Sequence, residues 1–145
     1  MKQMKKEIHT HIEINAPANK VWRVLSNFSD YPTWNPFITS ISGDMEVGSQ
    51  IEAQIVPPGS KPMTFKPTVL VHNPNQEFRW LGSVGIKGIF DGEHFFILHE
   101  NEGVTTFTHG EKFKGLLIPF MGKVFEKTKQ GFEEMNEALK AKCEA

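Results

Sequence analysis

The chain of 145 residues contains a single cysteine, Cys143. One thiol cannot form an internal disulfide or supply a multi-cysteine zinc site, so neither can hold the fold together. The sequence also lacks a charge excess, because 16 Lys and Arg residues stand against 17 Asp and Glu residues. We therefore expect no nucleic-acid partner and no electrostatic attraction to an anionic membrane.

Long apolar runs are missing as well. No segment approaches the roughly 18 consecutive apolar residues of a membrane span, and the first residues are charged. We expect a cytoplasmic protein, a monomer or weak dimer, that does not insert stably into a membrane. A chain of this length buries about 68–70% of the surface that its unfolded form exposes. We therefore expect residues 1–145 to form one domain that needs no metal or other cofactor.

Tyrosine is scarce, whereas phenylalanine is abundant: the chain has one Tyr, three Trp and twelve Phe. Phe is a bulky apolar side chain without a hydroxyl group. Many Phe residues are typical of an ordinary core, and they also line pockets for flat or apolar ligands.

In the N-terminal part, polar and apolar residues alternate up to residue 14, and the alternation then stops. Residues 7–14 have period 2, which predicts a half-buried strand with Glu7, His9, His11 and Glu13 on its wet face. Short helices are predicted after Pro17, up to Pro36. Six further segments, separated by turn formers such as Gly85, are predicted strands: 38–43, 49–56, 63–73, 76–84, 88–100 and 103–113. Pro67 within one of them indicates an edge position or a bulge.

The C-terminal part has a helical period from Pro119 to Lys142, about 36 Å at ~1.5 Å per residue. Its apolar stripe, with 3-4 spacing, consists of Ile118, Met121, Phe125, Thr128, Phe132, Met135 and Leu139. One strand, short helices, six strands and a long helix predict an α+β fold. In this fold one antiparallel sheet of about seven strands buries a face against the helix.

Four stretches carry a resemblance to a known family: Ile14–Pro17 followed by Val21-Trp22, Tyr31–Phe37, Phe90–Phe96 and Thr105–Leu117. They resemble the START/birch-pollen-allergen superfamily, often called SRPBCC, in its polyketide cyclase/dehydrase branch. The resemblance implies the helix-grip fold, in which a curved antiparallel sheet wraps a long C-terminal helix. It also implies a cavity between sheet and helix, open near the loops and the short helices. Members include lipid carriers, hormone receptors, cyclases and chaperone partners, so the resemblance implies no single activity.

The last two predicted strands bring polar residues together. If Asn101-Glu102 form the hairpin tip, paired residue numbers sum to 203 and His94 lies opposite His109. Glu111 is then diagonal to His94 on the same face, which also carries Phe96, Phe107 and Phe113 and is taken as the inward one. A one-residue shift at Gly103 would place the two histidines on opposite faces.

Three interpretations of His94, His109 and Glu111 stay open. They can satisfy one another as buried polar groups. They can orient a polar group of a bound ligand, or act as general acids and bases on an enolisable substrate, as aldol cyclisation requires. Two histidines and a carboxylate also resemble a facial metal triad, but no further ligand motif supports it, and we predict no metal site.

The function that we expect is binding of a hydrophobic or aromatic small molecule between sheet and helix. One alternative is a polyketide cyclase/dehydrase-like enzyme that uses the His and Glu groups. Another is a protein-interaction module with a filled core, which predicts no cavity above ~300 Å³. Besides the three polar residues, the candidate ligand contacts are Trp34, Phe37, Phe96, Phe107, Phe113, Met121 and Phe125.

Overall fold

A computed structural model describes residues 4–83 and 88–145. Along the chain its elements are β1 (Lys5–Ile14), α1 (Ala18–Ser26), η1 (Phe28–Asp30), α2 (Tyr31–Trp34), β2 (Ile38–Ser42), β3 (Glu52–Ile55), β4 (Met63–Phe65), β5 (Thr68–Asn73), β6 (Glu77–Ser83), β7 (Asp91–Asn101), β8 (Val104–Lys114), η2 (Ile118–Phe120) and α3 (Gly122–Glu144). The predicted turn at Gly85 lies outside the described residues.

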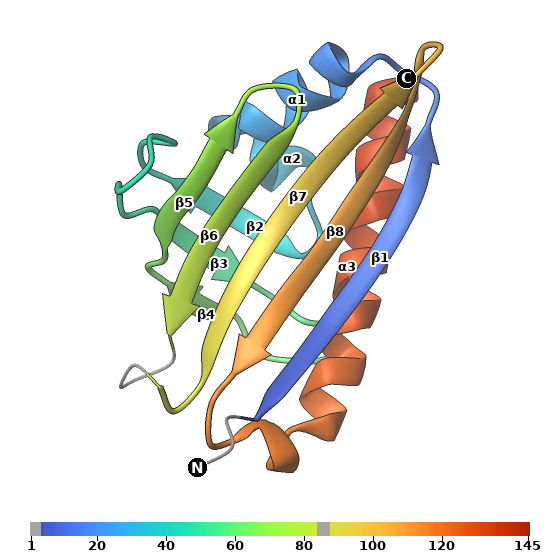
Figure 1. Cartoon of the computed structure of the whole chain (residues 1–145). Coiled ribbons are helices and arrows are strands. Elements are labelled where there is room, and N and C mark those ends of the chain that lie inside the picture. Colours follow the sequence, from blue (N-terminus) through green and yellow to red (C-terminus); the bar gives the residue numbers. More distant parts are fainter. Residues whose placement is uncertain (1–3, 84–87) are drawn as a thin grey trace.

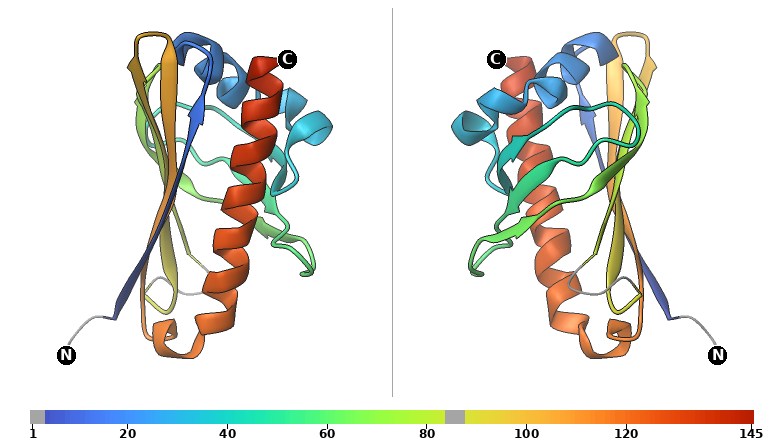
Figure 2. Two further views of the ribbon diagram at one scale, coloured as in Figure 1. Left: turned by 90° about the vertical axis from the view of Figure 1, so that its right-hand side faces the viewer. Right: turned by 90° about the vertical axis from the view of Figure 1, so that its left-hand side faces the viewer.

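Two antiparallel sheets and one long helix make up the architecture. The larger sheet has the order β1-β8-β7-β6-β5, and the smaller has the order β2-β3-β4. Figure 2 shows α3 and the smaller sheet on the same side of the larger one, with α1 and α2 beside the C-terminal end of α3 (Figure 1). The predicted helix-grip fold is therefore confirmed.

Pro67 separates two strands where one was predicted. The segment 63–73 forms β4 in the smaller sheet and β5 in the larger sheet. The backbone between them still pairs, since Ile51 N donates to Pro67 O (2.9 Å) and Val69 N donates to Ser49 O (2.9 Å). Pro67 has no N–H to donate, and here its carbonyl makes the bond. The two sheets therefore meet at this point.

The long helix starts later than predicted. Pro119 belongs to the 3₁₀ turn η2, and Met121, with φ −117° and ψ 25°, leaves helical geometry before α3 begins. The apolar stripe of α3 is buried as expected: Phe132, Met135 and Leu139 are fully buried against the sheets. Three further residues of α3 are buried outside the predicted stripe, namely Gly131, Asn136 and Cys143.

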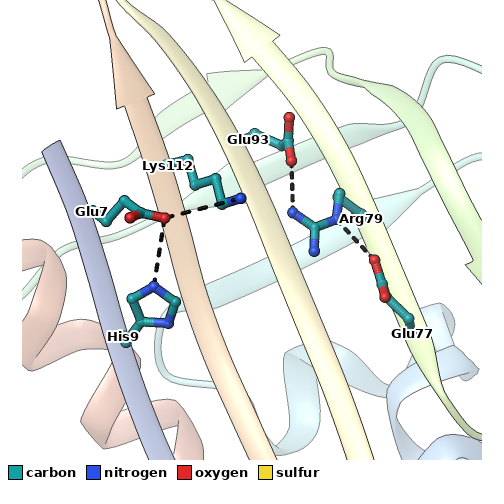
Figure 3. A network of polar contacts seen from close by, with 6 residues as sticks. All are labelled: Glu7, His9, Glu77, Arg79, Glu93 and Lys112. Carbon is teal, nitrogen blue, oxygen red and sulfur yellow. Dashed lines mark hydrogen bonds and ion pairs between the residues drawn. The ribbon is translucent and has the colours of Figure 1, made fainter. Parts of the chain in front are cut away.

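The outer face of the large sheet carries a polar network (Figure 3). Arg79 donates to Glu77 (2.8 Å) and to Glu93 (2.6 Å). Glu7 lies 3.6 Å from His9, and both are half exposed, as the alternation predicts for β1. The Arg79 guanidinium also covers the ring of Phe95, 4.6 Å from its centroid. The ion pairs therefore shield the one large aromatic residue of β7 that faces outward.

Candidate functional site

The hairpin between β7 and β8 decides the geometry of the predicted site. Its turn is Glu102-Gly103, with φ of 51° and 80°, as a two-residue type I′ turn requires. His94 therefore pairs with Glu111, and Phe96 with His109. The predicted register, with His94 opposite His109, was wrong by two residues. A two-residue shift keeps every side chain on its face, so all three polar residues do point inward.

Both histidines are buried among aromatic rings. Trp80 stacks on His94 at 4.6 Å between centroids, and Phe132 stacks on His109 at 4.0 Å. Burial lowers the pKa of His94 to about 3. Burial and the neighbouring His94 also hold the pKa of His109 well below its usual value. Both imidazoles are therefore neutral near neutral pH.

Five side chains form a continuous hydrogen-bond chain through the core. Glu111 Oε1 lies 3.0 Å from His94 Nδ1, and His94 Nε2 lies 2.8 Å from His109 Nε2. His109 Nδ1 lies 3.0 Å from Asn136 Oδ1. Asn136 Nδ2 donates to Thr10 Oγ1 (2.8 Å), which donates to the backbone oxygen of His109 (2.8 Å). The buried polar groups satisfy one another, as the first interpretation expects.

Sequence reasoning missed two members of this chain, Thr10 and Asn136. Thr10 lies on the buried face of β1, opposite the wet face that the alternation of residues 7–14 predicts. Asn136 is one residue beyond Met135 of the apolar stripe and is 97% buried. A polar residue on a buried helix face needs a partner, and this was the signal available in the sequence.

Glu111 lies where the hydrogen-bond chain meets the surface of a cavity. Its side chain is 17% exposed, in contrast to the fully buried histidines. Burial raises the pKa of Glu111 to about 8. The opposite strand makes room for this carboxyl group, since a Cβ atom on Gly92 would collide with Glu111 Oε2.

A cavity of about 90 Å³, partly open to solvent, lies between β6–β8, the β3–β4 hairpin and the N-terminal half of α3. Its walls are chiefly apolar. It is lined by Phe37, Ile55, Pro57, Met63, Phe65, Pro67, Trp80, Gly82, Ser83, Phe90, Gly92, His94, Glu111, Phe113, Val124 and Thr128. Its volume is below ~300 Å³, as the filled-core alternative predicts.

Four of the predicted ligand contacts line this cavity: Phe37, His94, Glu111 and Phe113. Six do not, namely Trp34, Phe96, Phe107, His109, Met121 and Phe125. Trp34 packs against Tyr31 on α2 (5.3 Å between centroids), and the described lining of this cavity includes Pro57 of a loop but no residue of α1 or α2. Phe96 and Phe107 are instead fully buried in the hydrophobic core, in one cluster with Phe132 and Met135.

The signal for the missed part of the wall was present in the β3–β4 hairpin. Apolar residues Ile55, Met63 and Phe65 flank its proline-rich tip, and all three face the cavity. Their separation from the last strands along the chain concealed the contact.

The described residues provide neither a cluster of metal-ligating side chains nor a membrane-spanning helix. Within 4–83 and 88–145, no group of three or more His, Cys, Asp or Glu side chains is arranged to hold a metal ion. None of the described helices is long and apolar enough to cross a membrane.

Comparisons with known proteins agree with this architecture. The model of the family described as "Polyketide cyclase / dehydrase and lipid transport" matches residues 5–144. No curated protein matches the sequence.

Three solved structures illustrate the similarity of fold. The Zhui aromatase/cyclase from Streptomyces sp. R1128 has a TM-score of 0.79 at 12% identity, over 97% of this chain and 94% of that one. Ara h 8.0201 has a TM-score of 0.72 at 14% identity, over 97% and 98%. Norcoclaurine synthase from Thalictrum flavum, in complex with dopamine and hydroxybenzaldehyde, has a TM-score of 0.69 at 16% identity, over 96% and 86%.

Proposed function

The chain belongs to the polyketide cyclase / dehydrase and lipid transport family, and from this premise we propose that it binds a small, largely apolar molecule between its sheets and α3. The observation that carries the proposal is the composition of the cavity wall. Rings of Trp80, Phe90 and Phe113 surround a space whose polar groups include the His94–Glu111 pair. An apolar wall with a few polar groups is typical of small-molecule sites.

The volume of the cavity limits the ligand. A dry engineered cavity of about 150 Å³ holds benzene, and this cavity measures about 90 Å³ and is partly open. A single-ring compound that leaves part of itself in the opening fits best. The norcoclaurine synthase complex, with dopamine and hydroxybenzaldehyde, supports a ligand of this size.

A second candidate is acid–base catalysis at Glu111. The observation that favours it is the raised pKa of this carboxyl group, about 8, on the wall of the cavity. A group with a pKa near the working pH can both donate and accept a proton. The fold shared with the Zhui aromatase/cyclase supports this candidate.

Native mass spectrometry of the freshly purified protein tests ligand binding. We expect a noncovalent mass above the 16.5 kDa chain that is lost on denaturation. Val124→Trp, which places an indole in the opening of the cavity, should abolish the extra mass. Lys127→Trp, at an exposed position of the same helix, is the matched control and should retain it.

A bare chain would lead to a screen of single-ring compounds with the same two variants. If no compound distinguished Val124→Trp from Lys127→Trp, the binding proposal would fail. The filled-core interaction module would then be the better interpretation.

A further inference from the structure

The hydrogen-bond chain has a direction, and Thr10 sets it at the end remote from the cavity. The Thr10 hydroxyl donates its one hydrogen to the backbone oxygen of His109. Its oxygen must therefore accept from Asn136, which turns the Asn136 Nδ2 group toward Thr10. The Asn136 Oδ1 atom then faces His109 Nδ1. An amide oxygen only accepts, so the hydrogen lies on His109 Nδ1.

The remaining hydrogens follow in sequence. A neutral imidazole carries one N–H, so His109 Nε2 accepts and His94 Nε2 donates to it. His94 Nδ1 then has no hydrogen and must accept from Glu111 Oε1. Glu111 can donate only as a neutral carboxylic acid. The raised pKa of Glu111, caused by burial, agrees with this result.

The other carboxyl oxygen of Glu111 is left for the cavity. Among the described residues, Oε1 is the only Glu111 oxygen with a hydrogen-bond partner. Oε2 lies over Gly92 on the cavity side and is not among the buried atoms that lack a partner. In a neutral acid whose hydrogen points at His94, Oε2 is a carbonyl oxygen. It offers the ligand a hydrogen-bond acceptor without a full charge.

No charge elsewhere on the described wall complements an ionic ligand. Of the described lining residues, only His94 and Glu111 are titratable, and Trp80, Phe113, Val124 and Thr128 from the surrounding elements are neutral. A carboxylate ligand would meet an acceptor oxygen and apolar rings. Its desolvation would not be compensated.

We propose that Thr10 holds Glu111 in its neutral form through this chain, and that the cavity takes an uncharged single-ring ligand whose O–H or N–H group donates to Glu111 Oε2. Phenols are the simplest ligands of this class. The inference rests on the proposed binding function for its ligand, and on the hydrogen bonds and the neutral, buried imidazoles for its protons. Thr10 is a positioning residue, since it acts through Asn136 and the two histidines.

The test compares this arrangement with the one in which every hydrogen bond from Glu111 to Asn136 runs in the opposite direction. An ionised Glu111 would accept from His94 Nδ1, and each further bond to Asn136 would reverse. The Thr10 hydroxyl would then have to leave the His109 oxygen. Thr10→Val removes the group that opposes this reversal. Thr105→Val is the matched control. Thr105, on β8, is buried as Thr10 is, and its hydroxyl likewise donates to a backbone oxygen, that of Ala16 (2.7 Å). It takes no part in the hydrogen-bond chain.

Nitrogen-15 NMR of the imidazole rings reads the protons directly. We expect the wild-type protein to hold His94 as the Nε2–H tautomer and His109 as the Nδ1–H tautomer. In Thr10→Val, His94 should gain the Nδ1–H tautomer, and the carboxyl carbon of Glu111 should titrate about one unit lower, a tenfold change in acidity. Thr105→Val should match the wild type. Reversed tautomers in the wild type would overturn the inference, even if Thr10→Val fails to fold.

Binding of phenol, benzoate and benzylamine at about pH 6.5, followed by NMR shift changes, tests the ligand class. At this pH phenol is neutral and the other two are ionised. We expect phenol to bind at least tenfold more tightly than either ion. Equal or tighter binding of benzoate would overturn the ligand class. If no probe bound while the tautomers were as stated, the proposed function and the ligand class would fall, and the proton arrangement would stand.

Discussion

At the scale of single residues, a neutral carboxyl group is the most unusual feature of this protein. Glu111 shares a proton with His94, a histidine that burial keeps uncharged. Each of these groups would be costly alone in the core. Together with Asn136 and Thr10 they satisfy one another, so a ligand need only meet one oxygen of Glu111.

Glu111→Gln separates binding from catalysis. Its carboxamide can donate an N–H to His94 Nδ1 and still present an oxygen to the cavity. We expect the free energy of unfolding at about pH 6.5 to change by less than ~1 kcal/mol and ligand binding to persist. Any acid–base activity should fall about 10²-fold or more, because an amide does not titrate in this range.

Urea denaturation and turnover assays check these outcomes. Glu111→Leu is the comparison, since it leaves His94 Nδ1 without a donor and should cost about 1–3 kcal/mol. A large loss of stability in Glu111→Gln, equal to that in Glu111→Leu, would contradict a neutral Glu111.

The same groups predict a stability maximum near pH 6.5. The histidines are neutral when folded, whereas the unfolded chain binds their protons below the ordinary pKa of 6.5. Stability therefore rises with pH up to that value. Glu111 acts oppositely between 4.5 and about 8, because the native chain keeps a proton that the unfolded chain has released. The two rising histidine contributions exceed the falling Glu111 contribution until the histidines of the unfolded chain are about half titrated, near pH 6.5.

Above pH 6.5 the unfolded chain loses its remaining histidine protons, and the Glu111 contribution becomes the larger one. Because the histidine and Glu111 contributions partly cancel, we expect the free energy of unfolding to fall by roughly 0.6 kcal/mol per pH unit up to about pH 8. Urea titrations at a series of pH values measure this slope. The slope should vanish in Glu111→Gln, and its persistence there would assign it to another group.

At the scale of elements, close contacts decide how α3 lies against the sheets. Gly131 is buried in the middle of α3, and a Cβ atom there would collide with the ring of Phe37, the residue that precedes β2. The ring of Phe37 in turn meets Phe132 edge-on at 5.4 Å. The absence of a side chain at one helix position therefore lets Phe37 reach the cavity.

Gly131→Ala should destabilise the protein although alanine favours helices. We expect a net loss of up to about 2 kcal/mol, since overpacking a tight core costs about 1–3 kcal/mol and the gain in helix propensity is about 1 kcal/mol. Gly122→Ala, in the first turn of the same helix, would meet nothing within 4 Å and is the control. Thermal unfolding compares the two, and a stabilised Gly131→Ala would show that Phe37 moves without cost.

At the scale of the whole molecule, sheet and helix enclose a small remaining space. Beside the middle and the C-terminal half of α3 the interior is filled by the buried side chains of Phe132, Met135 and Leu139. Beside the N-terminal half of α3 a cavity of about 90 Å³ lies between this helix and the β3–β4 hairpin. The proposed binding site therefore lies at one end of the fold, since its lining residues belong to the parts of β6, β7, β8 and α3 that are away from α1 and α2 (Figure 1).

A ligand that occupies this space should stabilise the entire fold. With phenol at about 100 times its Kd, the native state gains about 2.7 kcal/mol. For a chain of this size this corresponds to a rise of about 5–10 °C in Tm. Differential scanning fluorimetry should show the rise in the wild type and in Lys127→Trp. An equal rise in Val124→Trp would place the binding site elsewhere.

Most of the elements and their buried faces could be predicted from the sequence alone, because hydrophobic period is a local property. Alternation in 7–14 and the stripe from Phe125 to Leu139 predicted the faces that are buried. The side-chain alternation of β7 and β8 likewise put His94, His109 and Glu111 on one face. It did so even with the wrong hairpin turn, because a shift of two residues preserves faces.

The hydrogen-bond partners in the core and the position of the cavity depend on contacts between elements that are distant along the chain. Thr10 and Asn136 are 126 residues apart, and their contact gives the hydrogen-bond chain its direction. The position of the cavity depends on how side chains from distant elements pack between the sheets and α3. Phe132 stacks on His109 in the filled part of the core, and residues of the β3–β4 hairpin line the cavity. The volume of a cavity is set by how several elements pack against one another, so no local sequence pattern predicts it.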